Sequence, residues 1–362
     1  MALMTRDDYV ESLRVMNKRV FIMGQEVEDL VDHPLVRPSL NACAMTYDLA
    51  QLPEHADLAQ ATSNLTGKKV NRFTHLHQDA SDLVAKVKMQ RRLGQMTGCC
   101  FQRCVGLDAI NALDSVTYQM DQALGTGYHA AFRRYLQYLQ ERDLVADGAM
   151  TDPKGDRRLS PSQQADPDLF VRIVDRKPDG IVVRGAKLHQ TGALNAHEII
   201  VMPTQTLSEQ DQDYAVAFAI PADAPGIVMI YGRQPSDTRK LENSELDVGN
   251  RQFGGHEAII ILDNLFVPWE RVFMAGEVAF SGLLVERFAG YHRQSYGGCK
   301  AGVGDVLIGA AQALARYQGT DRASHIRDKI VEMVHLNETL YACGIACSAE
   351  GKPTPSGTYL ID

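Results

Sequence analysis

The chain has 362 residues, of which 45% are hydrophobic and 23% charged, as in an ordinary soluble globular protein. Its net charge of −8, without a basic block, argues against nucleic-acid binding. Apolar runs such as 258–262 are far shorter than the roughly 20 residues of a membrane helix, and the N-terminus does not resemble a signal peptide. We therefore expect a cytoplasmic protein with no membrane and no nucleic-acid partner.

Residues 1–148 are predicted to form an N-terminal helical domain. Segments 81–95 and 106–141 are rich in Ala, Leu, Met, Gln and Arg, with apolar residues at the three- and four-residue spacings of amphipathic helices. Gly125 and Gly127 interrupt the second segment, where we expect a break or kink.

Residues 149–280 change to short β-branched runs. A turn-rich linker at 151–156 comes first, and Gly, Pro, Asp and Asn separate the runs that follow. The runs lie at 169–174, 181–184, 199–202, 214–220, 226–230 and 258–266. This pattern predicts a small antiparallel barrel or sandwich.

Helical periodicity returns in residues 281–362. Segments 281–320 and 324–349 are predicted to be helices, and two helices alone have little to pack against. We expect this region to be the first part of a C-terminal helical domain that is cut short, or that leans on another chain.

The first cysteine motif is Cys99-Cys100-Phe-Gln-Arg-Cys104. If this segment is helical, Cys100 and Cys104 lie on one face, where two thiolates can share a metal or cluster. The alternative is that these small, soft side chains pack in a helical core.

The second motif runs from His292 to Lys300. At 3.6 residues per turn, His292, Tyr296, Cys299 and Lys300 fall on one stripe, which presents an imidazole, a phenol, a thiol and an amine. Such a stripe is typical neither of a core, which would be aliphatic, nor of a solvated face. Glycines at 297–298 weaken a helix but let a bulky group approach its backbone.

Together the two motifs supply three thiols and one imidazole. This donor set suits an iron–sulfur cluster or a structural zinc, although the C-x-x-C pairs usual for zinc are absent. A histidine ligand would leave one iron exchangeable and able to act as a Lewis acid on a substrate oxygen.

Four other cysteines are predicted to be structural. The odd total of seven argues against a disulfide framework. Cys343 and Cys347 share the four-residue spacing, but their neighbours are small or apolar, so we interpret them as core packing. Cys43 is also expected in the core, and Cys99 would point about 100° away from Cys100 on a helix.

Two further features are weaker. Thr191 and Gly192 place a hydroxyl beside an unhindered amide, which suits the edge of a flat heterocycle but also an ordinary turn. Glu257 precedes an apolar strand, where a carboxylate serves either as a general base or as a surface acid. No Gly-x-Gly-x-x-Gly or phosphate-binding loop is present.

These motifs carry a resemblance to a known family. The run Asp-Asn-Leu-Phe-Val-Pro-Trp-Glu-Arg-Val at 263–272 is similar to a strand-end signature of the acyl-CoA dehydrogenase superfamily, and more closely to the 4-hydroxyphenylacetate 3-hydroxylase group. Within that group, Cys-Phe-Gln-Arg-Cys at 100–104 and His-x₃-Tyr-x₂-Cys-Lys at 292–300 resemble the 4-hydroxybutyryl-CoA dehydratases, which also act as vinylacetyl-CoA isomerases.

The resemblance implies an α+β, acyl-CoA-dehydrogenase-like fold with a helical domain, a β-barrel and a second helical domain, assembled as a homotetramer. It implies that Cys100, Cys104, His292 and Cys299 hold a 4Fe–4S cluster. Glu257, Tyr296 and Lys300 would line the acyl-CoA site, with His292 doubling as a base. The residues that it implies for FAD are Thr151, Asp152, Lys154, Gly155, Asp156, Arg157, His189, Gln190 and Thr191.

The implied reaction is dehydration of 4-hydroxybutyryl-CoA to crotonyl-CoA through a ketyl radical, which makes the otherwise inert C3 hydrogen acidic. Family members continue well beyond residue 362 with helices that complete the bundle and flavin site and supply a further catalytic glutamate. Two alternatives stay open. One is an aromatic monooxygenase that uses reduced flavin, and the other is a non-catalytic remnant that still binds flavin.

Overall fold

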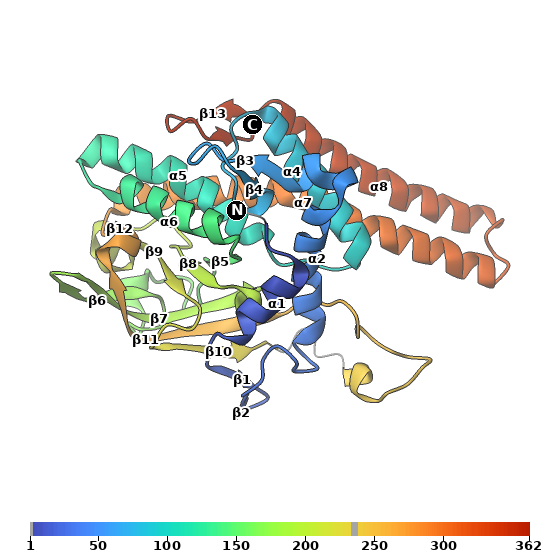
Figure 1. Ribbon diagram of the computed structural model, residues 1–362, viewed down its shortest axis with the longest axis horizontal. Coiled ribbons are helices and arrows are strands. Elements are labelled where there is room, and N and C mark those ends of the chain that lie inside the picture. The colour runs from blue at the N-terminus through green and yellow to red at the C-terminus, as the bar shows by residue number, and fades with distance from the viewer. Residues whose placement is uncertain (1–2, 233–237) are drawn as a thin grey trace.

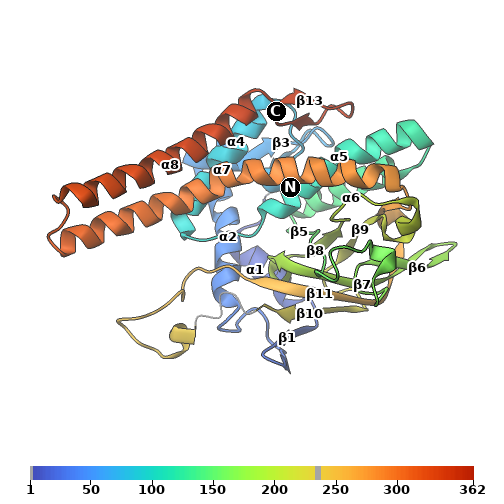
Figure 2. The same ribbon diagram turned by 180° about the vertical axis from the view of Figure 1, so that it is seen from behind.

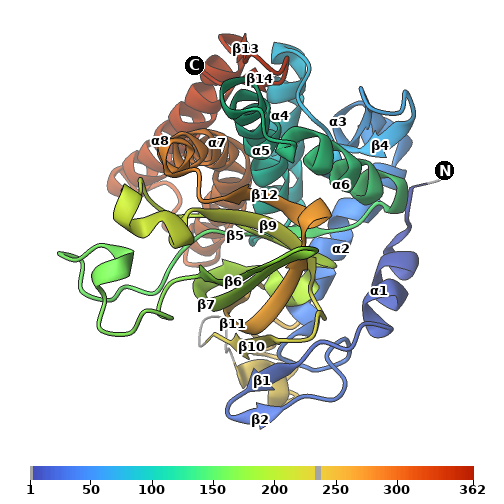
Figure 3. The same ribbon diagram turned by 90° about the vertical axis from the view of Figure 1, so that its left-hand side faces the viewer.

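A layer of helices lies against a pair of β-sheets in the computed structural model, which describes residues 3–232 and 238–362 (Figure 1). Figure 3 shows the helical layer above and the sheets below, with α1 and the β1–β2 hairpin at the edge. The α-helices are α1 (Arg6–Arg14), α2 (Arg37–Gln51), α3 (Ala56–Ala59), α4 (Ala80–Thr97), α5 (Cys104–Leu124), α6 (Tyr128–Arg142), α7 (Val278–Tyr317) and α8 (Ser324–Ala349).

The strands are short near the termini and longer in the middle of the chain. They are β1 (Val20–Ile22), β2 (Gln25–Glu26), β3 (Gln60–Thr62), β4 (Lys69–Asn71), β5 (Ala146–Ala149), β6 (Arg172–Lys177), β7 (Gly180–Thr191), β8 (Glu198–Val201), β9 (Val216–Pro221), β10 (Ile227–Tyr231), β11 (Glu257–Pro268), β12 (Val272–Ala275), β13 (Lys352–Pro353) and β14 (Tyr359–Leu360).

The central strands form two sheets. One has the order β2-β1-β10-β11-β7-β6 and the other the order β12-β9-β8-β5. Their facing apolar side chains, such as the fully buried Ile199, Phe218 and Ile260, form the core between them. The described strands therefore pair as two packed sheets, which supports the sandwich alternative rather than one closed barrel. Unlike the antiparallel expectation, β1–β10 and β5–β8 are parallel pairs.

The helical segments predicted from periodicity are confirmed. α4 and α8 coincide closely with 81–95 and 324–349, and the expected break falls between α5 and α6, where Gly125 caps α5 in a left-handed conformation. β5 begins at Ala146, within the predicted N-terminal domain, and pairs with β8. The domain boundaries at 148/149 and 280/281 stay predictions. No helix in the described ranges is long and apolar enough to cross a membrane.

Glycines on α7 set how closely its neighbouring helices pack. A Cβ on Gly298 would lie 2.5 Å from the carbonyl oxygen of Val87 on α4, and one on Gly297 would lie 2.7 Å from the Cα of Gly344 on α8. The expected close approach to this glycine pair is thus confirmed, and the approaching groups are helices. α7 is held between α4 and α8 over the segment that carries the His292 stripe (Figure 2).

Replacing Gly302 tests this packing, since a Cβ there would lie 2.1 Å from the carbonyl oxygen of Arg91 on α4. Overpacking typically costs about 1–3 kcal/mol, so we expect Gly302→Ala to lower the thermal midpoint. Gly309→Ala is the matched control on the same helix, because nothing lies within 4 Å of its Cβ position. Alanine has the higher helix propensity, so the control should be neutral or slightly stabilised. Equal thermal midpoints of the parent and Gly302→Ala in a melting experiment would refute the packing argument.

Candidate active site

Cys100 and Cys104 lie at the junction of α4 and α5 rather than on one helix. α4 ends at Gly98 in a left-handed conformation, Cys100 lies in the connecting loop, and Cys104 is the first residue of α5. Gln102 between them has a φ of 59°, which is uncommon for a residue with a side chain. The expected helical face is therefore wrong, although the two thiols still meet because the loop folds back.

Gln102 ties this loop to the sheets. Its Nε2 donates to the carbonyl oxygen of His256 at 2.7 Å, and its Oε1 accepts from Nδ2 of Asn195 at 2.9 Å. A Cβ on Gly192 would lie 2.6 Å from the Gln102 carbonyl oxygen, which is why that position carries glycine. The cysteine loop is thereby held at the end of β7 and the start of β11.

The α7 stripe faces this loop. The rings of His292 and Tyr296 meet edge to face at 5.1 Å, and Nζ of Lys300 lies 5.7 Å from the centre of the Tyr296 ring. Cys299 is 6% exposed, whereas Tyr296 is 40% exposed. The stripe therefore combines a buried thiol with an accessible phenol and amine.

The thiols interact with one another and with the stripe. The Cys104 thiol donates to Cys100 and, together with the nearby Lys300 and His292, lowers the pKa of Cys100 to about 7. Burial, together with the negative charge of a Cys100 thiolate, raises the pKa of Cys299 to about 12. None of the cysteines in the described ranges is in a disulfide. The structure thus brings Cys100, Cys104, Cys299 and His292 together.

These side chains are not arranged around a single ion. Among the residues that the structure describes, no group of three or more His, Cys, Asp or Glu side chains has the geometry to hold one metal ion.

His292 is anchored by a buried network behind it. Its Nδ1 lies 2.9 Å from Oδ2 of Asp108, a fully buried carboxylate on α5. The other oxygen, Oδ1, accepts from Nζ of Lys86 on α4 at 2.6 Å. Sequence reasoning missed both groups. The available signal was the set of polar residues at 108, 111 and 114, spaced about one turn apart in the first, mostly apolar half of the helix.

The residues proposed for the flavin are brought together in part. In the sheet Glu257 pairs with Thr191, and its Oε2 lies 2.9 Å from Nδ1 of His189, which has a φ of 55°. Nε2 of Gln190 donates to the Thr151 carbonyl oxygen at 3.1 Å. These groups form a polar edge beside the cysteine loop.

The rest of the linker is split between two places. Asp152 accepts from Nζ of Lys187 at 2.6 Å and so stays against β7. Lys154, Gly155 and Arg157 are exposed further along, where Asp156 pairs with the guanidinium of Arg158 at 2.8 Å. The structure therefore does not bring Lys154, Gly155, Asp156 and Arg157 to the edge formed by His189 and Thr191.

The remaining cysteines differ from expectation in one respect. Cys43 is fully buried, as predicted. Cys99 is partly buried, and its thiol points to the Cys100 carbonyl oxygen at 3.7 Å. The core interpretation is wrong for Cys343, which is exposed, and Cys347 is only partly buried. The reason is that α8 packs on its neighbours mainly through the small residues Gly344 and Ser348.

Replacing this pair of cysteines checks the choice of ligands. We expect Cys343→Ala to change the free energy of unfolding by no more than about 0.5 kcal/mol and Cys347→Ala to cost about 1 kcal/mol. Iron and sulfide content per chain should stay at the parent value in both variants. Loss of iron from either variant would mean that the ligands include this pair.

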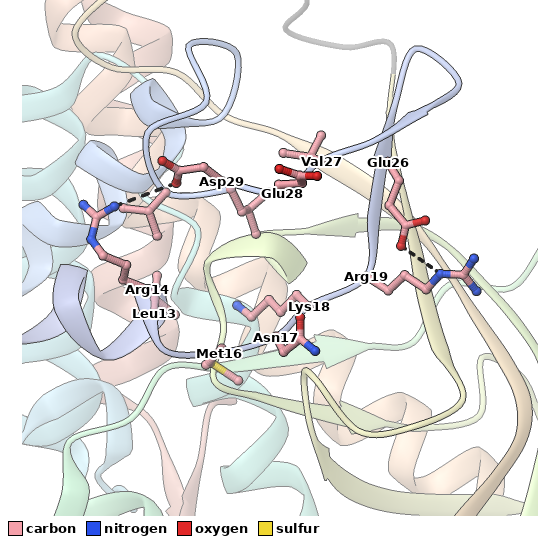
Figure 4. Close-up of a pocket in the computed structure, with 12 residues that line it drawn as sticks. Leu13, Arg14, Met16, Asn17, Lys18, Arg19, Glu26, Val27, Glu28 and Asp29 are labelled. Carbon is pink, nitrogen blue, oxygen red and sulfur yellow. Dashed lines mark hydrogen bonds and ion pairs between the residues drawn. The ribbon is translucent and has the colours of Figure 1, made fainter.

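A separate cavity of about 430 Å³ lies between the end of α1 and the β1–β2 hairpin (Figure 4). Ion pairs flank it, with Arg14 to Asp29 at 3.8 Å and Arg19 to Glu26 at 3.0 Å. Nζ of Lys18 donates to the Leu194 carbonyl oxygen at 2.8 Å. None of the site residues predicted from the sequence lines this cavity, so it is distinct from the cysteine site.

Comparison with known proteins agrees with this arrangement. The family model described as 4-hydroxyphenylacetate 3-hydroxylase N terminal matches residues 5–274, and its C terminal counterpart matches residues 281–362. The chain is 62% identical over 361 residues to 4-hydroxybutyryl-CoA dehydratase/vinylacetyl-CoA-Δ-isomerase of Clostridium aminobutyricum, covering 99% of this chain and 74% of the relative.

Two solved structures are similar in fold. The oxygen-tolerant archaeal 4-hydroxybutyryl-CoA dehydratase of N. maritimus has a TM-score of 0.97 at 55% identity, over 100% of this chain and 72% of that one. The oxygenase component of 4-hydroxyphenylacetate 3-monooxygenase, complexed with FAD, has a TM-score of 0.83 at 24% identity, over 99% of this chain and 74% of that one.

Fold and matches place the chain in the class of 4-hydroxyphenylacetate 3-hydroxylase-like proteins. Within that class it belongs to the 4-hydroxybutyryl-CoA dehydratase family.

Proposed function

We propose that this chain dehydrates 4-hydroxybutyryl-CoA to crotonyl-CoA and isomerises vinylacetyl-CoA. The supporting relative is 62% identical, whereas the aromatic monooxygenase relatives are at most 28% identical. The observation that carries the proposal is the meeting of three thiols and one imidazole beside the edge that holds Glu257. An aromatic hydroxylase has no use for that donor set.

Cys100, Cys104, Cys299 and His292 fit the ligand set of a 4Fe–4S cluster. Each ligand of such a cluster bonds a different iron, so the donors stand farther apart than around one ion. This accounts for side chains that interact without forming a mononuclear site. When bound, the cluster supplies a Lewis-acidic iron, and FAD supplies one-electron redox chemistry.

The polar edge formed by Thr151, His189, Gln190, Thr191 and Glu257 suits a flavin ring. It offers a hydroxyl, an imidazole and backbone groups, and a relative in fold is complexed with FAD. Asp152, held by Lys187, would keep the linker in place. We propose that Lys154, Gly155, Asp156 and Arg157 contact a more distant part of the cofactor.

The stripe on α7 would then work on the acyl chain. We propose that His292 removes the C3 proton, while Glu257, Tyr296 and Lys300 line the substrate site. Tyr296 and Lys300 are exposed enough to contact the acyl-CoA substrate, whereas the buried Cys299 is not.

A homotetramer is part of the proposal. The outer parts of α7 and α8 project from the helical layer (Figures 1 and 2) and carry large exposed apolar side chains. Exposed apolar patches of this kind mark interaction surfaces. The side chains are Leu307, Leu314, Val331, Val334 and Leu336. The cytoplasmic location stays an expectation from the sequence.

Anaerobic purification followed by iron, sulfide and flavin analysis tests the function. We expect about four iron and four sulfide per chain, a flavin spectrum, and conversion of 4-hydroxybutyryl-CoA to crotonyl-CoA. A protein that binds flavin without iron and hydroxylates phenols would establish the monooxygenase instead. Flavin binding with neither activity would establish the non-catalytic remnant.

A further inference from the structure

The imidazole of His292 is fixed from behind by one carboxylate. Oδ2 of Asp108 lies 2.9 Å from Nδ1 of His292, and the Asp108 side chain is fully buried. The hydroxyl of Ser295, one helical turn along α7, donates to the same carboxylate at 3.2 Å. A carboxylate can only accept hydrogen bonds, so Nδ1 must carry the proton in this contact.

Lys86 in turn fixes the carboxylate. Its Nζ donates to Oδ1 of Asp108 at 2.6 Å, and neither side chain is exposed. The other hydrogens of the same ammonium go to the Tyr291 carbonyl oxygen at 3.0 Å and to Oε1 of Gln294 at 2.9 Å. α4, α5 and α7 are thus joined through polar groups at one ring nitrogen of His292.

We propose that Asp108 is the positioning residue of His292, and that Lys86 holds Asp108 for that task. With Nδ1 protonated, Nε2 keeps its lone pair for the thiol side of the ring. A carboxylate that accepts from the ring nitrogen not used to bind the metal fixes both the tautomer and the orientation of a ligating histidine. The inference rests on the proposed function.

Stability alone does not account for this network. Buried ion pairs are often no better for stability than well-packed apolar side chains of similar volume. A purely structural Lys86–Asp108 pair would also not need to contact the partly exposed imidazole of His292 on α7. Asp114, two turns along α5, supplies the contrast, because its buried carboxylate instead accepts from the Thr358 hydroxyl at 2.6 Å and lies 3.9 Å from the Arg133 guanidinium.

The first test compares Asp108→Asn with Asp114→Asn in the holoenzyme. Loss of an outer-shell partner typically costs 10–100-fold in metal affinity or activity. We expect Asp108→Asn to lose iron to a chelator about 10–100-fold faster than the parent and to dehydrate the substrate more slowly. Asp114→Asn should show neither change. In case the single variant folds poorly, Lys86→Met/Asp108→Leu removes both charges and should show the same iron loss with a parent-like circular dichroism spectrum.

A double-mutant cycle shows whether Asp108 acts through the imidazole. In a His292→Cys background there is no Nδ1 to position, so Asp108→Asn should no longer change iron retention. An equal loss of iron with and without His292 would overturn the inference, as would equal losses from Asp108→Asn and Asp114→Asn.

A readout on the ring itself separates this inference from the proposed function. If the parent protein holds no iron, the cluster proposal has failed. Solid-state ¹⁵N spectra of the histidine-labelled chain then report the tautomer, with the His292 signals assigned by their absence in His292→Cys. Protonated Nδ1 in the parent and a mixture in Asp108→Asn would support the inference. Identical spectra would overturn it.

Discussion

His292→Cys should retain a substantial part of the iron while losing most of the dehydration of 4-hydroxybutyryl-CoA. A thiolate can replace the imidazole as a ligand, but it does not replace the proton transfer proposed for His292. General acid–base groups typically contribute about 10²–10⁴-fold in rate, so the rate should fall by that factor. Iron content per chain and the initial rate of crotonyl-CoA formation, measured on the same preparation, check this split.

His325→Cys on α8 is the matched control, because His325 is exposed and far along the chain from the cysteine loop. It should keep both the iron and the rate. If His292→Cys dehydrates at the parent rate, the base has been misassigned, and Glu257 or Lys300 becomes the better candidate. An aromatic hydroxylase would show no loss of dehydration, because it would have none.

The free energy of unfolding of the parent should fall as the pH rises from about 4 to about 7, and Asp147→Asn should remove a large part of that fall. Asp147 lies on β5 and is 1% exposed, and burial raises the pKa of its carboxyl to about 7. The folded chain therefore holds a proton that the unfolded chain, with an ordinary carboxyl pKa, releases near pH 4. The stabilisation contributed by the protonated Asp147 carboxyl is complete below pH 4 and is lost progressively as the pH rises from about 4 to about 7. The shift corresponds to at most about 4 kcal/mol.

Urea unfolding of parent and variant between pH 4 and pH 8 measures the difference. The two free energies should be similar at pH 4, and the variant should be the more stable at pH 8. Asp175→Asn on β6 is the control, since that carboxyl is exposed before and after unfolding. Parallel curves for the parent and Asp147→Asn would show that the carboxyl is not buried as described.

Long periodic segments were predictable, and local conformations were not. α8 spans 324–349 as its periodicity indicated, because amphipathic spacing extends over many turns. The loop at Cys100 was not foreseen, since it depends on left-handed backbone at Gly98 and Gln102. β1, β5 and β12 were missed because three or four residues carry too little alternation to detect.

The chemical residues of the candidate site were more predictable than their supports. Cys100, Cys104, His292 and Cys299 form a rare combination of residue types at informative spacings. Asp108 and Lys86 were not singled out, because sequence alone does not show that two opposite charges from different helices are buried together. The packing of Gly297 and Gly298 likewise became interpretable only when the opposing helices were known.

One consequence follows from the single helix that carries His292, Tyr296, Cys299 and Lys300. α7 runs without interruption from Val278 to Tyr317. Inserting or deleting one residue before His292 would rotate the whole stripe by about 100° relative to the cysteine loop. A substitution disturbs one side chain, whereas such a change in length misdirects four at once. Natural variants of this chain should therefore tolerate indels in the loops that precede α7, and reject them within its first turns.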